Sequence, residues 1–154
     1  MLLVTREALK SALREAFPIN IVPQLHESNI SVGFRRPALM IQMMPWGPRH
    51  ITSDVHEFKV RWQIVYFPQE DAAGNAVQAD LFNAADKLEQ RFGRESSLMA
   101  TDGTVLRLDD FNVEERDDVV YASLALCGYL RREEAAVTTL GEAEVDMNTE
   151  EENL

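Results

Sequence analysis

The sequence predicts an α+β fold: a single domain with a mostly antiparallel or mixed β-sheet of about six strands, two helices packed on one face, and an acidic C-terminal tail. Three observations lead to this prediction. Residues 55–68, VHEFKVRWQIVYFP, alternate apolar and charged side chains, which is typical of a long, half-buried strand. Two other stretches repeat apolar residues at helical spacing. A length of 154 residues suits one domain with one core.

The first predicted helix begins at Thr5 and ends before Pro18. Thr5 suits an N-cap, and Val4 and Leu9 have the spacing of a hydrophobic staple. The residue before a proline is disfavoured in the α region, so we expect Pro18 to end the helix.

Three extended segments are expected before the long strand. Residues 19–25 and 30–34 predict short strands, and residues 38–44, ALMIQMM, predict a strand covered on both faces. The methionines of that strand, Met40, Met43 and Met44, are assigned to the core, with an adaptable binding surface as the alternative. Residues 45–53 are then expected to form a loop.

The long strand itself spans more residues than most strands do, so a bend or bulge is expected before Phe58. Val65 and Phe67 break its charged face near the end. We therefore expect that end to be covered on its second face as well, by a helix or a neighbouring subunit.

The second predicted helix has Asn75 as its N-cap, Gln78 in a capping-box position, and Gly93 as a left-handed stop. Its apolar stripe is expected to cover the sheet, with Leu88 packed against Trp62. The stripe consists of Val77, Leu81, Ala84, Ala85, Leu88 and Phe92.

The last part of the domain is predicted to be a meander. Asp102–Gly103 is a hairpin signal that pairs residues 97–101 with 104–108. The apolar phase then slips, which predicts a β-bulge at Asp109 or Asp110. A turn at residues 115–118 leads into a final strand over residues 119–130.

The composition changes after residue 132, which we take as the end of the domain (1–132) and the start of the tail (133–154). The tail carries eight acidic residues and no Lys or Arg, and so predicts a solvated segment that serves contacts in an assembly. The net charge of −11 argues against a free-standing nucleic-acid binder. No apolar run is long enough for a membrane helix and no signal peptide is recognisable, so a cytosolic protein is expected.

Signatures of catalysis are missing from the sequence. There is no P-loop, no dinucleotide fingerprint, no H-E-x-x-H and no C-x-x-C, and no cofactor or metal is predicted. His50, Ser53, Asp54 and His56 are close in sequence, but a polar loop explains them better than a nucleophile and base. The acidic run from Asp109 to Asp118 is interpreted as a solvated turn rather than a calcium site.

Other single residues are assigned by their surroundings. Cys127, the only cysteine, is predicted to be a buried thiol. The expected partner contacts are Trp46, Arg49 and His50 in the loop, with Glu133 and Glu134 at the start of the tail.

The order of motifs adds a resemblance. A helix ending in AFP, the segment RRPALMIQM, a strand ending IVYFP, a helix DLFNAADKLEQRF, a DG hairpin and a last strand closing on YLRREE together cover about residues 5–134. This succession resembles the phage tail terminator family.

The resemblance implies a structural, non-enzymatic protein of the virion tail near the neck, assembled in the host cytoplasm. Such proteins form a ring, in known cases six-membered, that caps the tail tube, stops its polymerisation and joins the head. The implied partners are further copies of the chain, the tail tube protein and a head-to-tail connector or head-completion protein. No sequence-specific nucleic-acid binding and no membrane is implied, although DNA passes through such a lumen. The alternatives are a head-completion or connector ring component and a small hydrolase using residues 50–56.

Overall fold

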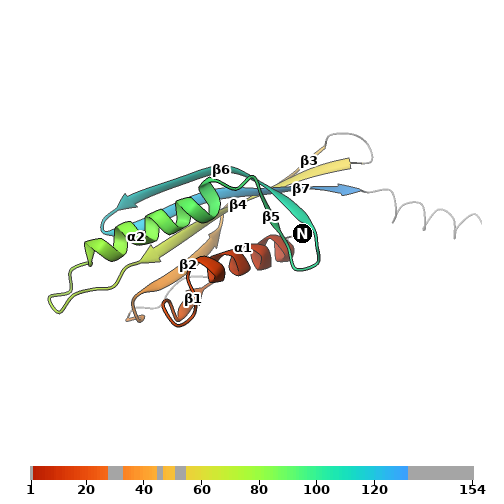
Figure 1. Ribbon diagram of the computed structural model, residues 1–154. Coiled ribbons are helices and arrows are strands. Elements are labelled where there is room, and N and C mark those ends of the chain that lie inside the picture. Colours follow the sequence, from red (N-terminus) through yellow and green to blue (C-terminus); the bar gives the residue numbers. More distant parts are fainter. Residues whose placement is uncertain (1, 28–32, 45–46, 51–54, 132–154) are drawn as a thin grey trace, which may run out of the picture.

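A computed structural model describes residues 2–27, 33–44, 47–50 and 55–131. A curled sheet carries two helices on one face (Figure 1). The elements in chain order are α1 (Leu2–Ala16), β1 (Gln24–His26), β2 (Ala38–Met43), β3 (Gly47–His50), β4 (Val55–Phe67), α2 (Gln78–Leu88), the π-helical turn η1 (Glu89–Gly93), β5 (Ser97–Met99), β6 (Val105–Arg116) and β7 (Val119–Arg131). The predicted α+β class, with both helices on one face, is confirmed.

Seven strands form the described sheet, where about six were predicted. Its order is β1-β2-β4-β7-β6-β5, with β3 paired to β4 beside this path. β1 and β2 are parallel and the other pairs are antiparallel. The sheet is therefore mixed, as the sequence allowed.

The long strand β4 lies at the centre of this arrangement. Its even-numbered apolar side chains are buried in the core under the helices: Phe58, Val60, Trp62, Ile64 and Tyr66. Pairing with β7 runs without a register shift from Val55, opposite Arg131, to Tyr66, opposite Val120. The bulge expected before Phe58 is therefore wrong. Since β7 is as long as β4, the two strands twist together and no inserted residue is needed.

Helix α1 begins earlier than predicted, at Leu2, and Thr5 is not its N-cap. Thr5 is fully buried inside the helix. Its hydroxyl donates to the Leu2 carbonyl at 2.8 Å and accepts the indole N–H of Trp62 at 3.2 Å. A buried indole needs an acceptor, and that tertiary demand explains the threonine better than capping does. The end of the helix before Pro18 is confirmed.

Helix α2 is also not capped as expected. Its N-cap is Val77, without a side-chain cap, and Asn75 lies in a preceding turn where its N–H donates to Asp71 at 2.9 Å. The carboxylate of Asp80, in the first turn, instead accepts the Tyr66 hydroxyl at 3.0 Å and the Gln69 N–H at 2.7 Å. Burial, and then this neighbouring carboxylate, raises the pKa of Tyr66 well above its usual range.

Gly93 ends η1, but it is not in the left-handed conformation that was predicted. A Cβ at this position would lie 3.2 Å from the ring of Phe111. Phe111 stacks on Phe92 with ring centroids 6.3 Å apart. Glycine is therefore suited to Gly93 because β6 approaches closely, and not because of a special backbone angle.

One early strand prediction and one loop prediction are corrected. The N–H groups of Ile21 and Val22 both donate to the Pro18 carbonyl at 2.9 Å, so residues 19–22 form a turn and only Gln24–His26 is a strand. Residues 30–32 of the second predicted strand lie outside the described residues. The predicted loop over 45–53 is replaced in part by β3, which forms a hairpin with β4.

The methionines of β2 divide between two environments. Met40 is half-buried, whereas Met43 and Met44 are exposed, so the core assignment is wrong for these two. They lie where β2 ends and β4 takes β3 as its neighbour. The side chains at the end of β2 are therefore exposed to solvent among the described residues.

The second face of β4 near its end is covered by the same chain. The Phe34 ring meets the Phe67 ring edge-on with centroids 4.7 Å apart, and the Arg36 guanidinium lies over both rings. Arg36 also pairs with Glu70 at 3.1 Å. The cover over Phe67 is a loop, and neither a helix nor another subunit is required.

The C-terminal meander follows the prediction closely. Gly103, at φ 89°, occupies the turn between β5 and β6, and a register shift separates Asp109 from Asn112. The next turn is tighter than expected, since Asp117 and Asp118 form it with φ of 55° and 60°. β7 continues to Arg131, one residue beyond the predicted end.

Replacing Gly128 by alanine is expected to destabilise the fold by about 1–3 kcal/mol. The new Cβ would lie 2.6 Å from the ring of Phe58, its register partner on β4. Chemical denaturation measures the change. Adding Phe58→Leu should recover part of the loss caused by Gly128→Ala, because the smaller side chain makes room. If the two substitutions destabilise additively, the contact is not the cause.

Candidate functional site

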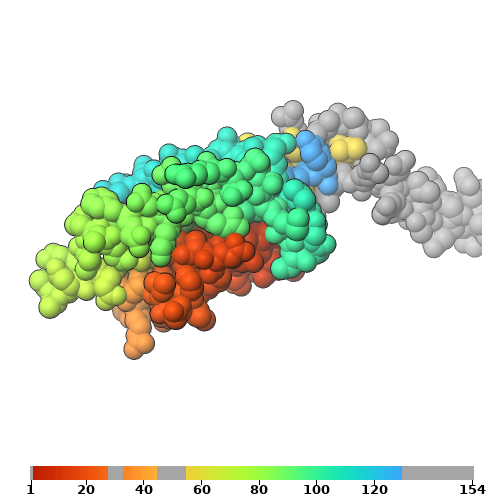
Figure 2. All heavy atoms as spheres, in the orientation of Figure 1, coloured from red at the N-terminus to blue at the C-terminus, as the bar shows by residue number. Residues whose placement is uncertain are grey.

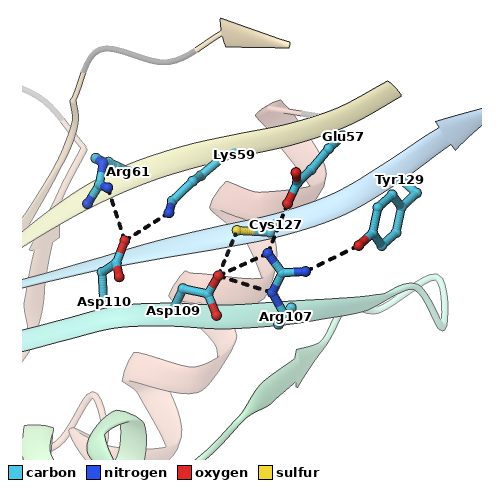
Figure 3. A network of polar contacts seen from close by, with 8 residues as sticks. All are labelled: Glu57, Lys59, Arg61, Arg107, Asp109, Asp110, Cys127 and Tyr129. Atoms are coloured by element: carbon cyan, nitrogen blue, oxygen red, sulfur yellow. Dashed lines mark hydrogen bonds and ion pairs between the residues drawn. The ribbon is translucent and has the colours of Figure 1, made fainter. Parts of the chain in front are cut away.

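The sheet face opposite the helices carries a set of interlocked charged side chains, which we call the polar sheet face (Figure 3). Odd-numbered residues of β4 and β7 and the start of β6 contribute to it because side chains alternate along a strand. Its members are Glu57, Lys59, Arg61, Arg107, Asp109, Asp110, Cys127 and Tyr129.

The bulge in β6 brings two consecutive carboxylates to this face. Asp110 is the inserted residue, at φ 56°, and it reaches across β7 to β4. It accepts from Lys59 at 2.8 Å and from Arg61 at 3.0 Å. Without the inserted residue, neighbours in sequence would point to opposite faces.

Arg107 connects the three strands of the polar sheet face. Its guanidinium donates to Asp109 at 3.0 Å, to Glu57 at 2.9 Å and to the Tyr129 hydroxyl at 3.3 Å. The hydrogen bond from Arg107 holds the pKa of Asp109 below its usual range. The result is a set of charges that are locally paired.

Cys127 lies beneath these charges. Its Sγ donates to Asp109 at 3.6 Å, and the side chain is buried. Burial, with the nearby Asp109 carboxylate, raises the pKa of the thiol. A protonated thiol is a poor nucleophile, and the predicted buried thiol is confirmed.

Asp110→Asn is expected to cost less than about 1 kcal/mol, because the ion pairs of Asp110 are solvent-exposed. Asp110→Ala should cost about 1–2 kcal/mol more, because alanine tolerates the left-handed conformation poorly. The hydrogen bond from Lys59 lowers the pKa of Asp110, so its ionic contribution is present above about pH 4 and is lost as the pH falls through the lowered value.

Unfolding curves at pH 7 and pH 3 test this. The gap between wild type and Asp110→Asn should narrow from pH 7 to pH 3, and the gap between the Asn and Ala variants should persist. A gap between Asn and Ala that closes as well would mean that the backbone conformation is not the cause.

An apolar patch adjoins the polar sheet face and shares Tyr129 with it. Its three side chains, Met99, Val105 and Tyr129, are 71%, 60% and 58% exposed. Met99 and Val105 are register partners in β5 and β6, and Tyr129 is tied to β6 through Arg107. An exposed aromatic and apolar group with a polar border is typical of a protein-contact surface.

A second apolar surface lies at the start of α1. A hollow of about 290 Å³ is lined there by Leu2, Leu3, Met43 and Trp62, together with Arg6 and Glu27. Arg6 pairs with Glu27 at 3.4 Å. The molecule thus presents two different apolar surfaces to possible partners.

The residues predicted as partner contacts are only partly described. Arg49 and His50 lie in β3, opposite Glu57 and His56 of β4. Trp46, Glu133 and Glu134 lie outside the described residues, and so do Ser53 and Asp54 of the hypothetical catalytic cluster. Within the described ranges, no group of three or more His, Cys, Asp or Glu side chains is placed to hold a metal ion.

Sequence reasoning missed Arg107, Val105 and Tyr129. Alternation along the two strands was the available signal, since it places all three on the face opposite the helices. None of the described helices is long and apolar enough to cross a membrane.

The described fold exposes apolar surfaces of the kind that proteins use to contact one another. A family comparison makes this specific: a model described as phage tail terminator protein matches residues 6–137. The chain belongs to the phage tail terminator family, as its motifs suggested. A comparison with curated proteins finds no match. The family is one of structural components of the virion tail.

Proposed function

We propose that this chain assembles into a homomeric ring, of six copies, that caps the tail tube, stops its polymerisation and joins the tail to the head-to-tail connector or head-completion protein. Assembly takes place in the host cytoplasm, and the ring lies near the neck of the virion. Membership of the tail terminator family over residues 6–137 carries the proposal. The chain has no catalytic role in this proposal.

The exposed surfaces support a ring. A head-to-tail contact that closes into a ring needs two different surfaces on each copy. The apolar patch and the hollow at the start of α1 are two such surfaces. Each has apolar side chains together with charged groups beside them.

Strand pairing between copies contributes little to the proposed ring. β4 and β7 are flanked by other described strands over most of their length, and only residues 128–131 of β7 extend beyond the pairing with β6. The edge strands β1 and β5 have only three residues each. The unpaired part of β6 is interrupted by the bulge and carries Glu114, Glu115 and Arg116, features that discourage strand addition.

Val105→Asp is expected to prevent ring formation while leaving the fold intact, because a charge on the apolar patch opposes burial in an interface. Size-exclusion chromatography with light scattering should give six times the 17.5 kDa of one chain for the wild type and a smaller species for the variant. Phe82→Asp, at a 61% exposed position on α2, is the matched control and should leave the ring intact.

Capping is tested separately by polymerising tail tube protein with and without the ring. Tubes should stop growing once rings are added, and electron micrographs should show the ring at one end. A ring that binds the connector but not the tube would instead indicate the head-completion function. Rings that bind neither would contradict both proposals.

A further inference from the structure

We propose that a groove between α1 and α2 binds the acidic C-terminal tail, residues 133–154, of a neighbouring copy. The helix groove, as we call it, is lined by Glu15 and Ala16 at the end of α1 and by Lys87, Gln90 and Arg91 of α2 and η1. It encloses about 290 Å³ and is open to solvent. Figure 2 shows the two helices side by side on the helix-covered side of the molecule.

The helix groove holds two cations and one carboxylate. Arg91 donates to Glu15 at 3.2 Å, but its Nε is buried and has no acceptor among the described residues. Lys87 lies over the ring of Phe17, 5.4 Å from its centroid, with no carboxylate beside it in the described chain. Buried N–H groups and cations are stabilised by hydrogen-bonded carboxylates, so the groove can accept further acidic groups.

The other two lysines of the chain are already paired. Lys10 contacts Glu27 at 2.5 Å, and Lys59 contacts Asp110 at 2.8 Å. Of the three lysines in the sequence, only Lys87 lacks a carboxylate partner among the described residues. This makes the helix groove the place where an incoming carboxylate meets a lysine without displacing another.

The tail has the complementary composition. It carries eight acidic residues and no Lys or Arg, in a chain whose net charge is −11. Val137, Leu140, Val145 and Met147 lie between its acidic positions and offer apolar contacts to the groove walls. Charge complementarity of this kind favours one partner surface over others.

The position at which the tail begins favours binding to the helix groove of a neighbouring copy over binding to its own. β7 ends at Arg131 where the ends of β4 and β7 project beyond the helices, at the same end of the molecule as the N-terminus of α1 (Figure 1). Glu15 and Ala16 lie at the other end of α1, about 20 Å along the helix. To reach its own groove the tail would have to turn back along the domain. Its 22 residues provide enough chain to bridge about 25 Å and so to reach an adjoining copy. The inference rests on the proposed ring only because the ring supplies this adjoining copy.

Carbodiimide cross-linking of the full-length protein tests the inference, because it joins a carboxylate to an amine only where the two are in contact. The sample is an equal mixture of ¹⁵N-labelled and unlabelled copies, analysed by mass spectrometry. We expect links from Lys87 to glutamates of the tail, with one peptide labelled and the other not. Raising the salt to 0.5 M should reduce these links several-fold, since it shortens the range of charge attraction.

Matched variants locate the effect. Arg91→Gln should reduce the Lys87 links several-fold. Arg35→Gln, which removes an exposed arginine outside the groove with no partner among the described residues, should leave them unchanged. Links to Lys10 or Lys59 in place of Lys87, links within one copy only, or no links to the tail would overturn the inference. Light scattering on the same sample reports the ring, so rings without Lys87 links would refute this inference and leave the proposed function standing.

Discussion

Replacing Leu88 by alanine is expected to lower the free energy of unfolding by about 2–5 kcal/mol. Leu88 is the last residue of α2 and is fully buried in the core between helices and sheet. Truncation removes its apolar contacts and leaves a cavity that the packed surroundings fill only in part. Urea denaturation with constant slope measures the change.

Phe82→Ala is the control for Leu88→Ala, because Phe82 lies on the same helix and is exposed. Because little packing is lost at an exposed position and alanine is the better helix former, Phe82→Ala should change the free energy of unfolding by less than about 1 kcal/mol. A loss below half a kcal/mol for Leu88→Ala would mean that α2 does not cover the sheet in solution. A Phe82→Ala loss as large as that of Leu88→Ala would place the opposite face of α2 in the core.

The predicted pairing of Leu88 with Trp62 is refined by the structure. Both belong to one core, but the indole of Trp62 is bonded to Thr5 of α1, whereas α2 lies against β7 and β6. The cavity left by Leu88→Ala is therefore expected between α2 and those two strands.

A chain that ends at Arg132 is expected to keep its melting temperature within about 2 °C and yet to complement a terminator-deficient phage poorly. The tail is short of large apolar residues, so we expect it to add little to a core. Its eight acidic residues repel one another and have few apolar neighbours, so they contribute little to folding. Thermal melts measure the first outcome and plaque counts the second.

A full-length chain with the eight tail carboxylates changed to amides is the control for this truncation. It keeps the length of the tail and removes its charge. If both variants complement poorly, the charge of the tail is what matters. If only the truncation complements poorly, its length is what matters. If the truncated chain unfolds, the tail is part of the folded domain. If the truncated chain complements fully, the tail has no essential role in assembly. The boundary at residue 132 stays a prediction until this is measured.

The sequence by itself determined the features that depend on neighbours along the chain. The two-residue alternation of β4, the turn at Gly103, the bulge beside Asp109 and the end of α1 before Pro18 all appear as predicted. Each is a local property, because side-chain alternation, left-handed turns and the restriction before proline act over a few residues. The burial of Cys127 was predicted from the apolar run in which it lies.

The tertiary structure decided which groups meet. Thr5 reads as a cap from its neighbours in sequence, but a tryptophan 57 residues away makes it a buried acceptor. Asp110 reads as part of a solvated turn, but the bulge directs it to two cations on β4. The helix groove brings the ends of two distant helices together. These sites depend on long-range pairing and on the curl of the sheet, and no local pattern records which residues such pairing makes neighbours.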